Sequence, residues 1–379
     1  MELNREDLID YATGATFLGT GGGGDPYIGR LMLQQEFDEG RRADIIDPQD
    51  LPDDALVITA AGIGAPTVMI EKIPCMVAAE QAVRAVEDRL GRKADAIISI
   101  EAGGANGTLP LVVAARMGLP VVDADGMGRA FPELHMVTFR VYGCKSAPLS
   151  LASERGDLMS IETESNVLAE RLARSAVINL GAMAQIALYP MSGADVKRTA
   201  VPNTLTLSLR IGQTISAARA SKQCPFTALI DFFAQANPPR HARILYDGKV
   251  SDVLRETQGG FARGAVTLVP IEGEDDPCRI TFQNEFLTAE KAGRTLTMVP
   301  DLITILDRET GEPITTEALR FGQRVKVMAV GVPPIMRTPE ALATFGPRAF
   351  GFDMDFVAVE DLPLDGLAPA AARSPVHAN

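Results

Sequence analysis

The sequence predicts an α/β protein: an N-terminal three-layer α/β domain on a mostly parallel sheet, followed by a C-terminal part that combines helices with a β-rich sandwich or barrel. In the first half of the chain, short apolar runs alternate with helical segments, as in successive βαβ units. Beyond residue 239 the hydrophobic period falls to two, as in short antiparallel strands. A length of 379 residues is sufficient for two domains.

The N-terminal α/β domain is expected to span residues 1–166 and to begin with two helices. Asn4 is a candidate N-cap for the first helix, and Asp25 and Pro26 can cap and open the second. Helices are expected over residues 4–18, 26–37, 76–90 and 109–117, and the last two of them precede a glycine. Strands are expected over residues 55–60, 95–100, 120–123, 136–142 and 147–152.

The C-terminal part, residues 167–362, divides into a helical segment (167–238) and a β-rich segment (239–362). Helical periodicity covers residues 164–189, 204–220 and 226–235. Strands are expected over residues 243–246, 250–257, 261–268, 278–286, 294–299, 302–307 and 324–329. Residues 363–379 end in an Ala/Pro-rich stretch and are expected to form a flexible tail.

Charge and cysteine content exclude several classes of partner. The chain has 49 acidic and 36 basic residues, so a nucleic-acid backbone would be repelled and nucleic acid is not expected to bind. No stretch reaches the roughly 18 apolar residues of a membrane-spanning helix, and the polar N-terminus does not resemble a secretory signal, so no membrane partner is expected. Four widely spaced cysteines without a CxxC pair favour reduced thiols and a cytoplasmic protein.

Candidate site residues follow the predicted parallel strands. In an open sheet, ligands bind beyond the carboxyl ends of the strands. The polar residues that stand there are Glu101, Asn106, Asp123, Asp125 and Arg129. Gly103 and Gly104 lie among them, and glycines let backbone N–H groups approach a ligand closely. The sequence therefore predicts a small-molecule site at this edge, with Asn106, Gly103 and Gly104 as hydrogen-bond donors.

A glycine run at residues 21–24 suggests nucleotide binding, but its context disfavours that interpretation. The run follows a predicted helix instead of a strand, and Asp25-Pro26 stands where a phosphate loop carries Lys and Ser or Thr. The Asp25 carboxylate would also occupy the place of a phosphate at the following helix. Two alternatives remain: a tight corner between helices, or a wall of a small-ligand site to which Gly22, Gly23 and Asp25 contribute.

Two kinds of catalytic centre fit the carboxylates after these strands. Asp123, Asp125 and His135 could ligate a divalent metal such as zinc that activates water. Alternatively, carboxyl groups act without a metal as an acid–base pair. Glu101 or Asp125 would then be the base, with Glu133 or His135 as the proton donor. Purely structural roles, such as capping a turn, remain open for the two aspartates.

Polar residues later in the chain could also reach the site. Gln283, Asn284 and Glu285 cannot all face solvent from one strand, so one of them is expected to point at a ligand, at the domain interface or into a network at a bulge. Arg129 could hold a carboxylate carried by the substrate, and Arg348 could do the same or lie on a surface turn.

Several motifs resemble those of the S-methyl-thiohydantoin desulfurase-like family, whose members are often labelled hydantoinase/oxoprolinase-related. The motifs are Leu18-Gly-Thr-Gly-Gly-Gly-Gly-Asp-Pro-Tyr-Ile-Gly29, Glu101-Ala-Gly-Gly-Ala-Asn106, Val122-Asp-Ala-Asp-Gly-Met-Gly-Arg-Ala-Phe-Pro-Glu-Leu-His135, Tyr189-Pro-Met-Ser-Gly193, Phe282-Gln-Asn-Glu285, Pro300-Asp-Leu-Ile303, Thr316-Glu-Ala-Leu-Arg320 and Gly346-Pro-Arg-Ala-Phe-Gly351. The similarity extends from about residue 5 to residue 360.

This resemblance implies the same two-part fold and hydrolytic removal of a thiol from an S-alkylated thiohydantoin ring, or work on a related hydantoin. It carries over no catalytic residues. We therefore expect a cytoplasmic hydrolase of a five-membered cyclic ureide or thioureide that binds a small molecule and no nucleotide. The alternative is a non-catalytic partner subunit of a hydantoinase-type complex. A homo-oligomer is the assembly expected of a bacterial-type metabolic enzyme.

Overall fold

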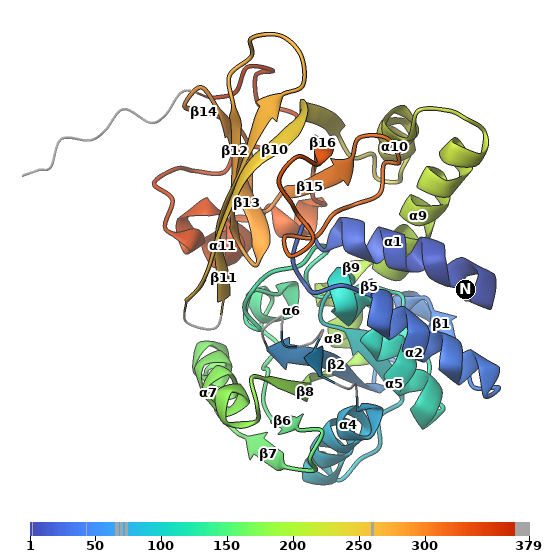
Figure 1. The fold of residues 1–379 in the computed structure, drawn as a ribbon. Helices are drawn as coiled ribbons and strands as arrows, with labels where there is room; N and C mark the ends of the chain where they lie inside the picture. Colours follow the sequence, from blue (N-terminus) through green and yellow to red (C-terminus); the bar gives the residue numbers. More distant parts are fainter. Residues whose placement is uncertain are drawn as a thin grey trace, which may run out of the picture.

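The computed structural model describes residues 1, 3–42, 44–64, 68, 71–72, 75–258 and 261–367. These residues fold around two seven-stranded sheets, with helix α1 (Leu8–Leu18) between them (Figure 1). The predicted α/β class is confirmed, since a sheet with parallel strands is followed by an antiparallel one. No helix in the described ranges combines the length and the apolar character needed to cross a membrane.

The first sheet, sheet A, has the strand order β1-β4-β3-β2-β8-β6-β7. Its strands are β1 (Ile45–Ile46), β4 (Val121–Val122), β3 (Ala96–Ser99), β2 (Leu56–Gly64), β8 (Met183–Ser192), β6 (Leu149–Ala152) and β7 (Leu158–Ile161). The strands from β1 to β2 are parallel to one another. The strands from β8 to β7 extend the sheet with antiparallel pairing.

Helices cover both faces of sheet A. The helices on one face are α2 (Tyr27–Asp38), α4 (Met76–Leu90) and α5 (Leu109–Met117), and those on the other are α7 (Asn166–Asn179) and α8 (Gly193–Thr199). Within β3, Ile97 joins the core under α4 and α5, whereas Ala96 and Ile98 join the core on the opposite face. Because both faces are buried, the strand is apolar throughout instead of alternating. Helices α4 and α5 have the predicted bounds, and each ends at a glycine in the left-handed region, Gly91 and Gly118.

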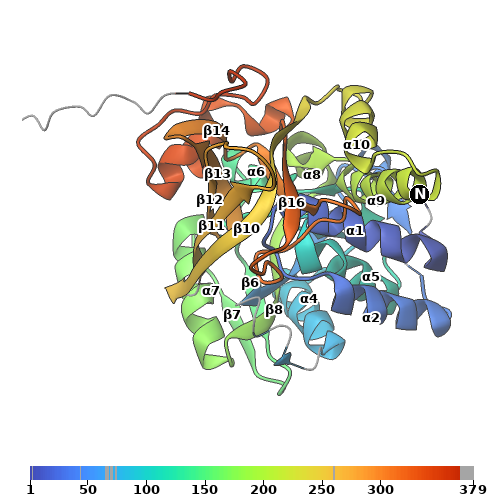
Figure 2. The ribbon, with the colours of Figure 1, turned by 45° about the horizontal axis from the view of Figure 1, so that its top comes forward.

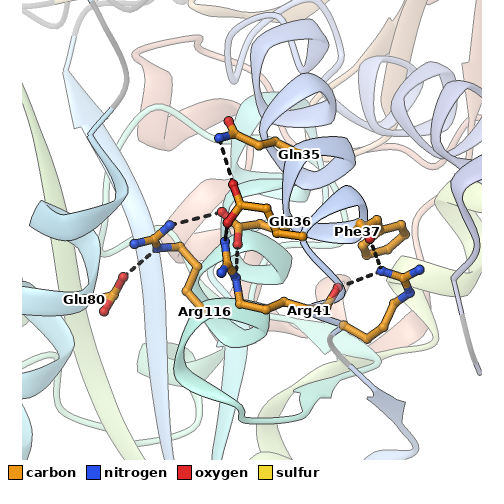
Figure 3. Close-up of polar contacts among 8 residues, drawn as sticks. Gln35, Glu36, Phe37, Arg41, Glu80 and Arg116 are labelled. Carbon is orange, nitrogen blue, oxygen red and sulfur yellow. Dashed lines mark hydrogen bonds and ion pairs between the residues drawn. The ribbon is translucent and has the colours of Figure 1, made fainter.

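A buried carboxylate links the three helices of the first face (Figure 3). Glu36, near the end of α2, is 4% exposed and forms an ion pair with Arg116 of α5 at 3.1 Å and another with Arg41. Arg116 also contacts Glu80 of α4 at 2.6 Å. Two cations therefore compensate the burial of Glu36, and the network ties α2, α4 and α5 together.

Two expected elements differ in the structure. Residues 136–142 form the short helix α6 (Thr138–Val141) instead of a strand, because the Thr138 N–H and hydroxyl both donate to the Gly126 carbonyl and bend the chain. The helix expected over residues 164–189 ends at Asn179, and Ala182 adopts a positive φ of 64° before β8 begins. Pairing of β8 with both β2 and β6 decides its conformation, which local periodicity did not predict.

Three further helices connect the two sheets. They are α1, α9 (Thr204–Ala220), which has the predicted bounds, and α10 (Pro225–Ala234). Helices α1 and α9 cross at two glycines. A Cβ on Gly14 would lie 1.7 Å from the Ser208 carbonyl oxygen, and one on Gly212 would lie 1.8 Å from the Asp10 carbonyl oxygen. The close approach of α1 and α9 therefore requires glycine at both positions.

The second sheet, sheet C, is antiparallel and has the order β14-β13-β12-β11-β10-β16-β15. Its strands are β10 (Ala242–Gln258), β11 (Phe261–Pro270), β12 (Cys278–Gln283), β13 (Glu285–Lys291), β14 (Arg294–Met298), β15 (Leu302–Asp307) and β16 (Arg324–Val330). The sheet curls until β13 contacts β15, so the predicted β-rich part is a half-barrel. Two expected strands merge into β10, and the one expected over residues 278–286 divides at Asn284, which has a φ of 57°.

Short elements complete the chain: η1 (Arg5–Asp7), η2 (Pro48–Asp50), η3 (Gly104–Gly107), β5 (Ala124–Asp125), β9 (Val201–Pro202), η4 (Pro334–Met336), α11 (Pro339–Phe345) and η5 (Pro347–Phe350). The β10–β11 ribbon reaches across to α7 (Figure 2). There the Arg174 guanidinium lies 4.8 Å from the centre of the Phe261 ring. Within the expected tail, Leu367 pairs with Thr295, and residues 368–379 lie outside the described residues.

Candidate functional site

A pocket of about 540 Å³, measured out to its open mouth, lies where β2 and β3 end and sheet C approaches them. Its lining comes from both halves of the chain: Gly23, Gly62, Ile63, Gly64, Ile100, Glu101, Asn106, Met127, Phe131, Pro132, Glu133, Leu134, Arg174, Asn284 and Glu285. The predicted position beyond the carboxyl ends of parallel strands is therefore a real hollow in the structure.

Glu101 lies two residues after the end of β3 and is 5% exposed. Its Oε1 accepts a hydrogen bond of 2.7 Å from the Asn106 amide, and its buried Oε2 has no hydrogen-bond partner. Asn106 is held in turn by the Gly62 N–H, which donates to Asn106 Oδ1 at 2.7 Å. Burial raises the pKa of Glu101 to about 8, although the hydrogen bond from Asn106 opposes that shift.

Glu285 is the second buried carboxyl of the pocket, and it comes from the first residue of β13. Its Oε1 accepts a hydrogen bond of 3.1 Å from the Gly23 N–H, and its Oε2 is buried without a partner. Burial, and next the charge of Glu101, raise the pKa of Glu285 well above its ordinary value. Asn284 directs this residue inward, because its positive φ reverses the chain and its backbone and side chain both pair with Ala262.

Arg129 supplies a buried positive charge behind the two carboxyls. Its guanidinium is fully buried and donates to the carbonyl oxygens of Ala130, Asp301 and Phe286 at 3.0, 2.9 and 2.9 Å. The charge lowers the pKa of both Glu101 and Glu285, although burial outweighs it at each. Arg129 was predicted to hold a substrate carboxylate, but it does not line the pocket, and three of its N–H donors bind backbone carbonyls.

The two aspartates predicted as base and metal ligands hold the backbone around the pocket. Asp125 is fully buried, and its carboxylate accepts from the N–H groups of Ala102, Met127 and Gly128 at 2.6, 3.3 and 2.8 Å. Burial raises the pKa of Asp125 to about 7. Asp125 thereby holds the loop that carries Glu101, but it does not line the pocket itself.

Asp123 begins helix α9 instead of holding a metal. Its Oδ1 accepts from the N–H groups of Leu205 and Thr206 at 2.9 and 3.0 Å. The predicted ligand set of Asp123, Asp125 and His135 is therefore not assembled. Among the described residues, no three His, Cys, Asp or Glu side chains are grouped so that they could hold a metal ion.

Glu133 and His135 lie at one side of the pocket. Glu133 lines it and is half-buried, and burial raises its pKa. His135 does not line the pocket, and its Nδ1 lies 3.4 Å from Glu133 Oε2. Burial and the nearby Arg140 lower the pKa of His135 to about 4, so this histidine is neutral near pH 7 and the contact is not an ion pair.

The glycine run packs against the loop after β3, and one of its residues lines the pocket. Gly23 lines the pocket, and Gly22 leaves room for Glu285, whose Oε1 would lie 2.3 Å from a Cβ on Gly22. Gly103 and Gly104 pack against residues 18–23 and do not line the pocket, which corrects their prediction as ligand donors.

Two predicted substrate-binding residues lie outside the pocket. Asp25 is exposed and accepts a hydrogen bond of 2.8 Å from the Tyr27 N–H at the start of α2. Arg348 is exposed and pairs with Asp353 and Asp355 at 3.1 and 2.7 Å, so the surface-turn alternative describes it. Neither residue lines the pocket of Glu101 and Glu285, although Asp25 lines the neighbouring hollow between α2, α4, α5 and β8.

A family model described as the S-Me-THD-like N-terminal domain matches residues 6–163, and one described as the S-Me-THD-like C-terminal domain matches residues 164–359. The chain belongs to the S-Me-THD-like family. This confirms the S-methyl-thiohydantoin desulfurase-like resemblance of its motifs. In this S-Me-THD-like chain, the motif segments 18–29, 101–106, 122–135 and 282–285 all contribute residues to the pocket.

A crystal structure of a protein from Chromobacterium violaceum has the same fold, with a TM-score of 0.80 and 24% sequence identity over 95% of this chain and 100% of that one. No curated protein matches the chain. The signal that sequence analysis missed is Glu285. The polar run at residues 283–285 indicated an inward-pointing side chain, but only the tertiary structure identifies which of the three meets Glu101.

Proposed function

We propose that this protein hydrolyses an S-alkyl thiohydantoin ring to the hydantoin and a free thiol. The observation that carries the proposal is the pair Glu101 and Glu285, two buried carboxyls in one pocket that each have an oxygen without a partner. Carboxyl groups with pKa values raised toward neutrality are suited to exchange protons with a substrate. The S-Me-THD-like family supplies the substrate class.

The two carboxyls differ in the ease with which they ionise. Asn106 donates a hydrogen bond to Glu101, and such a bond favours the charged form. Once Glu101 is charged, it opposes ionisation of Glu285. Glu101 therefore acts as the base and Glu285 remains protonated as the acid, with the charge of Arg129 balancing the single carboxylate.

Proton transfer between this pair and the ring accounts for the whole reaction. Glu101 removes a proton from water as the water oxygen bonds to the ring carbon that bears sulfur, and Glu285 protonates the ring nitrogen that receives the C=N electron pair. The new hydroxyl then returns a proton to Glu285 as the carbonyl forms, the C–S bond breaks, and Glu101 protonates the departing thiolate. Both carboxyls return to their starting state, and the overall change is the addition of water and the release of a thiol.

The proposal is tested by measuring thiol release from S-methyl-thiohydantoin in the presence and absence of a chelator. We expect turnover that resists the chelator and falls at least about 10³-fold in Glu101→Gln and in Glu285→Gln. Glu317→Gln is the matched control, since Glu317 is also mostly buried with an unpartnered oxygen and a raised pKa but lies outside the pocket. Full activity of both pocket variants would contradict the proposal.

Two other outcomes would favour a different function or mechanism. Turnover that the chelator abolishes and zinc restores would replace the acid–base pair with a metal mechanism. No turnover of any ring would favour the partner-subunit alternative.

A further inference from the structure

A second hollow adjoins the pocket that contains Glu101 and Glu285, which we refer to as the carboxyl pocket. The proposed reaction does not use this second hollow. It measures about 850 Å³ out to its mouth and lies between α2, α4, α5 and β8. Its wall is mostly apolar and includes Ile28, Met32, Met76, Leu109 and Met183. Methionine side chains are flexible and polarisable, so this wall can adapt to apolar groups of different shape. We refer to this hollow as the methionine pocket.

One buried polar residue, Gln185, lines the methionine pocket and also a smaller hollow beside it. Gln185 of β8 is 5% exposed and lines the hollow, and within the described part of the chain its side-chain amide has no hydrogen-bond partner. The Gln185 amide is therefore free to form hydrogen bonds with a molecule bound in the hollow. A ligand of this pocket is therefore expected to be apolar with a group that can hydrogen-bond to the Gln185 amide.

The two pockets are lined by residues that neighbour one another in β2, β8 and η3. Gly62 lines the carboxyl pocket and is paired in the β2–β8 ladder with Gln185, which lines the methionine pocket. Paired residues of antiparallel strands project from the same face of a sheet. In η3, Ala105 lines the methionine pocket and Asn106 lines the carboxyl pocket. A group attached to a ring in the carboxyl pocket is therefore beside the methionine pocket.

We propose that the methionine pocket binds the substituent of the substrate ring, and that the preferred substituent is apolar with one hydrogen-bonding group that pairs with Gln185. This inference rests on the proposed ring hydrolysis. It adds the preferred ring substituent, which the acid–base pair does not determine. The expected substrates are thiohydantoins with a bulky carbon side chain at C5, and the unsubstituted ring is a poor substrate.

The test uses S-methyl-thiohydantoins that carry hydrogen, benzyl or 4-hydroxybenzyl at C5. For the full-length protein we expect kcat/KM to be at least tenfold higher for the benzyl ring than for the unsubstituted ring. In Met32→Trp, which fills the methionine pocket, that ratio is expected to fall at least tenfold. In Gln185→Met, the preference for 4-hydroxybenzyl over benzyl is expected to be lost. Met159→Trp is the control, because Met159 is an exposed methionine of β7 outside both pockets, and it is expected to leave every ratio unchanged.

Equal kcat/KM values for the three rings, or ratios that Met32→Trp leaves unchanged, would overturn this inference while leaving the ring hydrolysis intact. If no ring releases thiol, the hydrolysis has failed, and the pocket is tested by calorimetric titration with the corresponding hydantoins. Binding of 5-benzylhydantoin that is tighter than that of hydantoin, and that Met32→Trp weakens at least tenfold, would support the pocket. Equal binding of the two hydantoins would overturn it.

Discussion

Glu101 and Glu285 come from different halves of the chain, yet both line the same pocket and each has a buried carboxyl oxygen without a partner; burial, and next the charge of Glu101, raise the pKa of Glu285. This coupling means that the two groups do not ionise independently. The pair therefore holds one proton over a pH range in which separate glutamates on the surface would hold none.

The first prediction concerns the pH dependence of activity. Because Glu101 must be ionised to act as the base and its pKa is about 8, kcat/KM is expected to rise with pH up to about 8. The Asn106 hydrogen bond lowers that pKa, so Asn106→Ala should move the rising limb upward by about one pH unit. Asn166→Ala is the control, since the Asn166 amide pairs with Ser146 and Cys144 away from the pocket. A limb that Asn106→Ala leaves in place would show that another group controls the rate.

The second prediction concerns stability. Between pH 4.5 and about 8, Glu101 is ionised in the unfolded chain but protonated in the folded one. The unfolded state therefore binds fewer protons, and the free energy of unfolding falls as the pH rises through this window. Glu101→Gln removes that loss, so its Tm should exceed that of the wild type by roughly 2–4 °C at pH 8, with a smaller difference at pH 5. A difference that does not change with pH would indicate that Glu101 ionises normally in the folded protein.

The third prediction separates the position of Glu285 from its chemistry. In Gly22→Ala the new methyl group would lie 2.3 Å from Glu285 Oε1, and a carboxyl at the end of a flexible side chain can move away from it. Activity should fall about 10²-fold while the Tm changes little, because displacement of a catalytic group by about 1 Å costs that much. Gly40→Ala is the matched control: Gly40 has a φ of 79° with nothing within 4 Å, so this variant should lose about 1 kcal/mol of stability and no activity.

The fourth prediction concerns the buried cation. Arg129→Lys keeps the charge but cannot make three directed hydrogen bonds to the carbonyls of Ala130, Asp301 and Phe286. Urea denaturation should show a loss of about 3 kcal/mol or more in the free energy of unfolding. The same exchange at exposed Arg348 should leave the free energy of unfolding almost unchanged, because solvent screens its ion pairs. Equal small losses at both positions would show that the carbonyl contacts of Arg129 do not stabilise the fold.

The sequence by itself determined the elements whose pattern is complete within one segment. Helices α4, α5 and α9 have the bounds that apolar periodicity and terminal glycines indicated. The placing of Glu101 and Asn106 at one pocket also followed from sequence, because residues after parallel strands meet at one edge of the sheet. These inferences depend on local order, which the chain specifies directly.

Only the tertiary structure decided which polar groups remained free for chemistry. Asp123 and Asp125 look like catalytic residues in sequence, but distant backbone N–H groups, those of Leu205 and Ala102 among others, occupy their oxygens. Glu285 looks like a strand residue in sequence, but the glycine run brings it to Glu101. A carboxyl group becomes available for catalysis when the fold buries it without satisfying it. That balance depends on contacts between segments far apart in the chain, so local sequence patterns do not contain it.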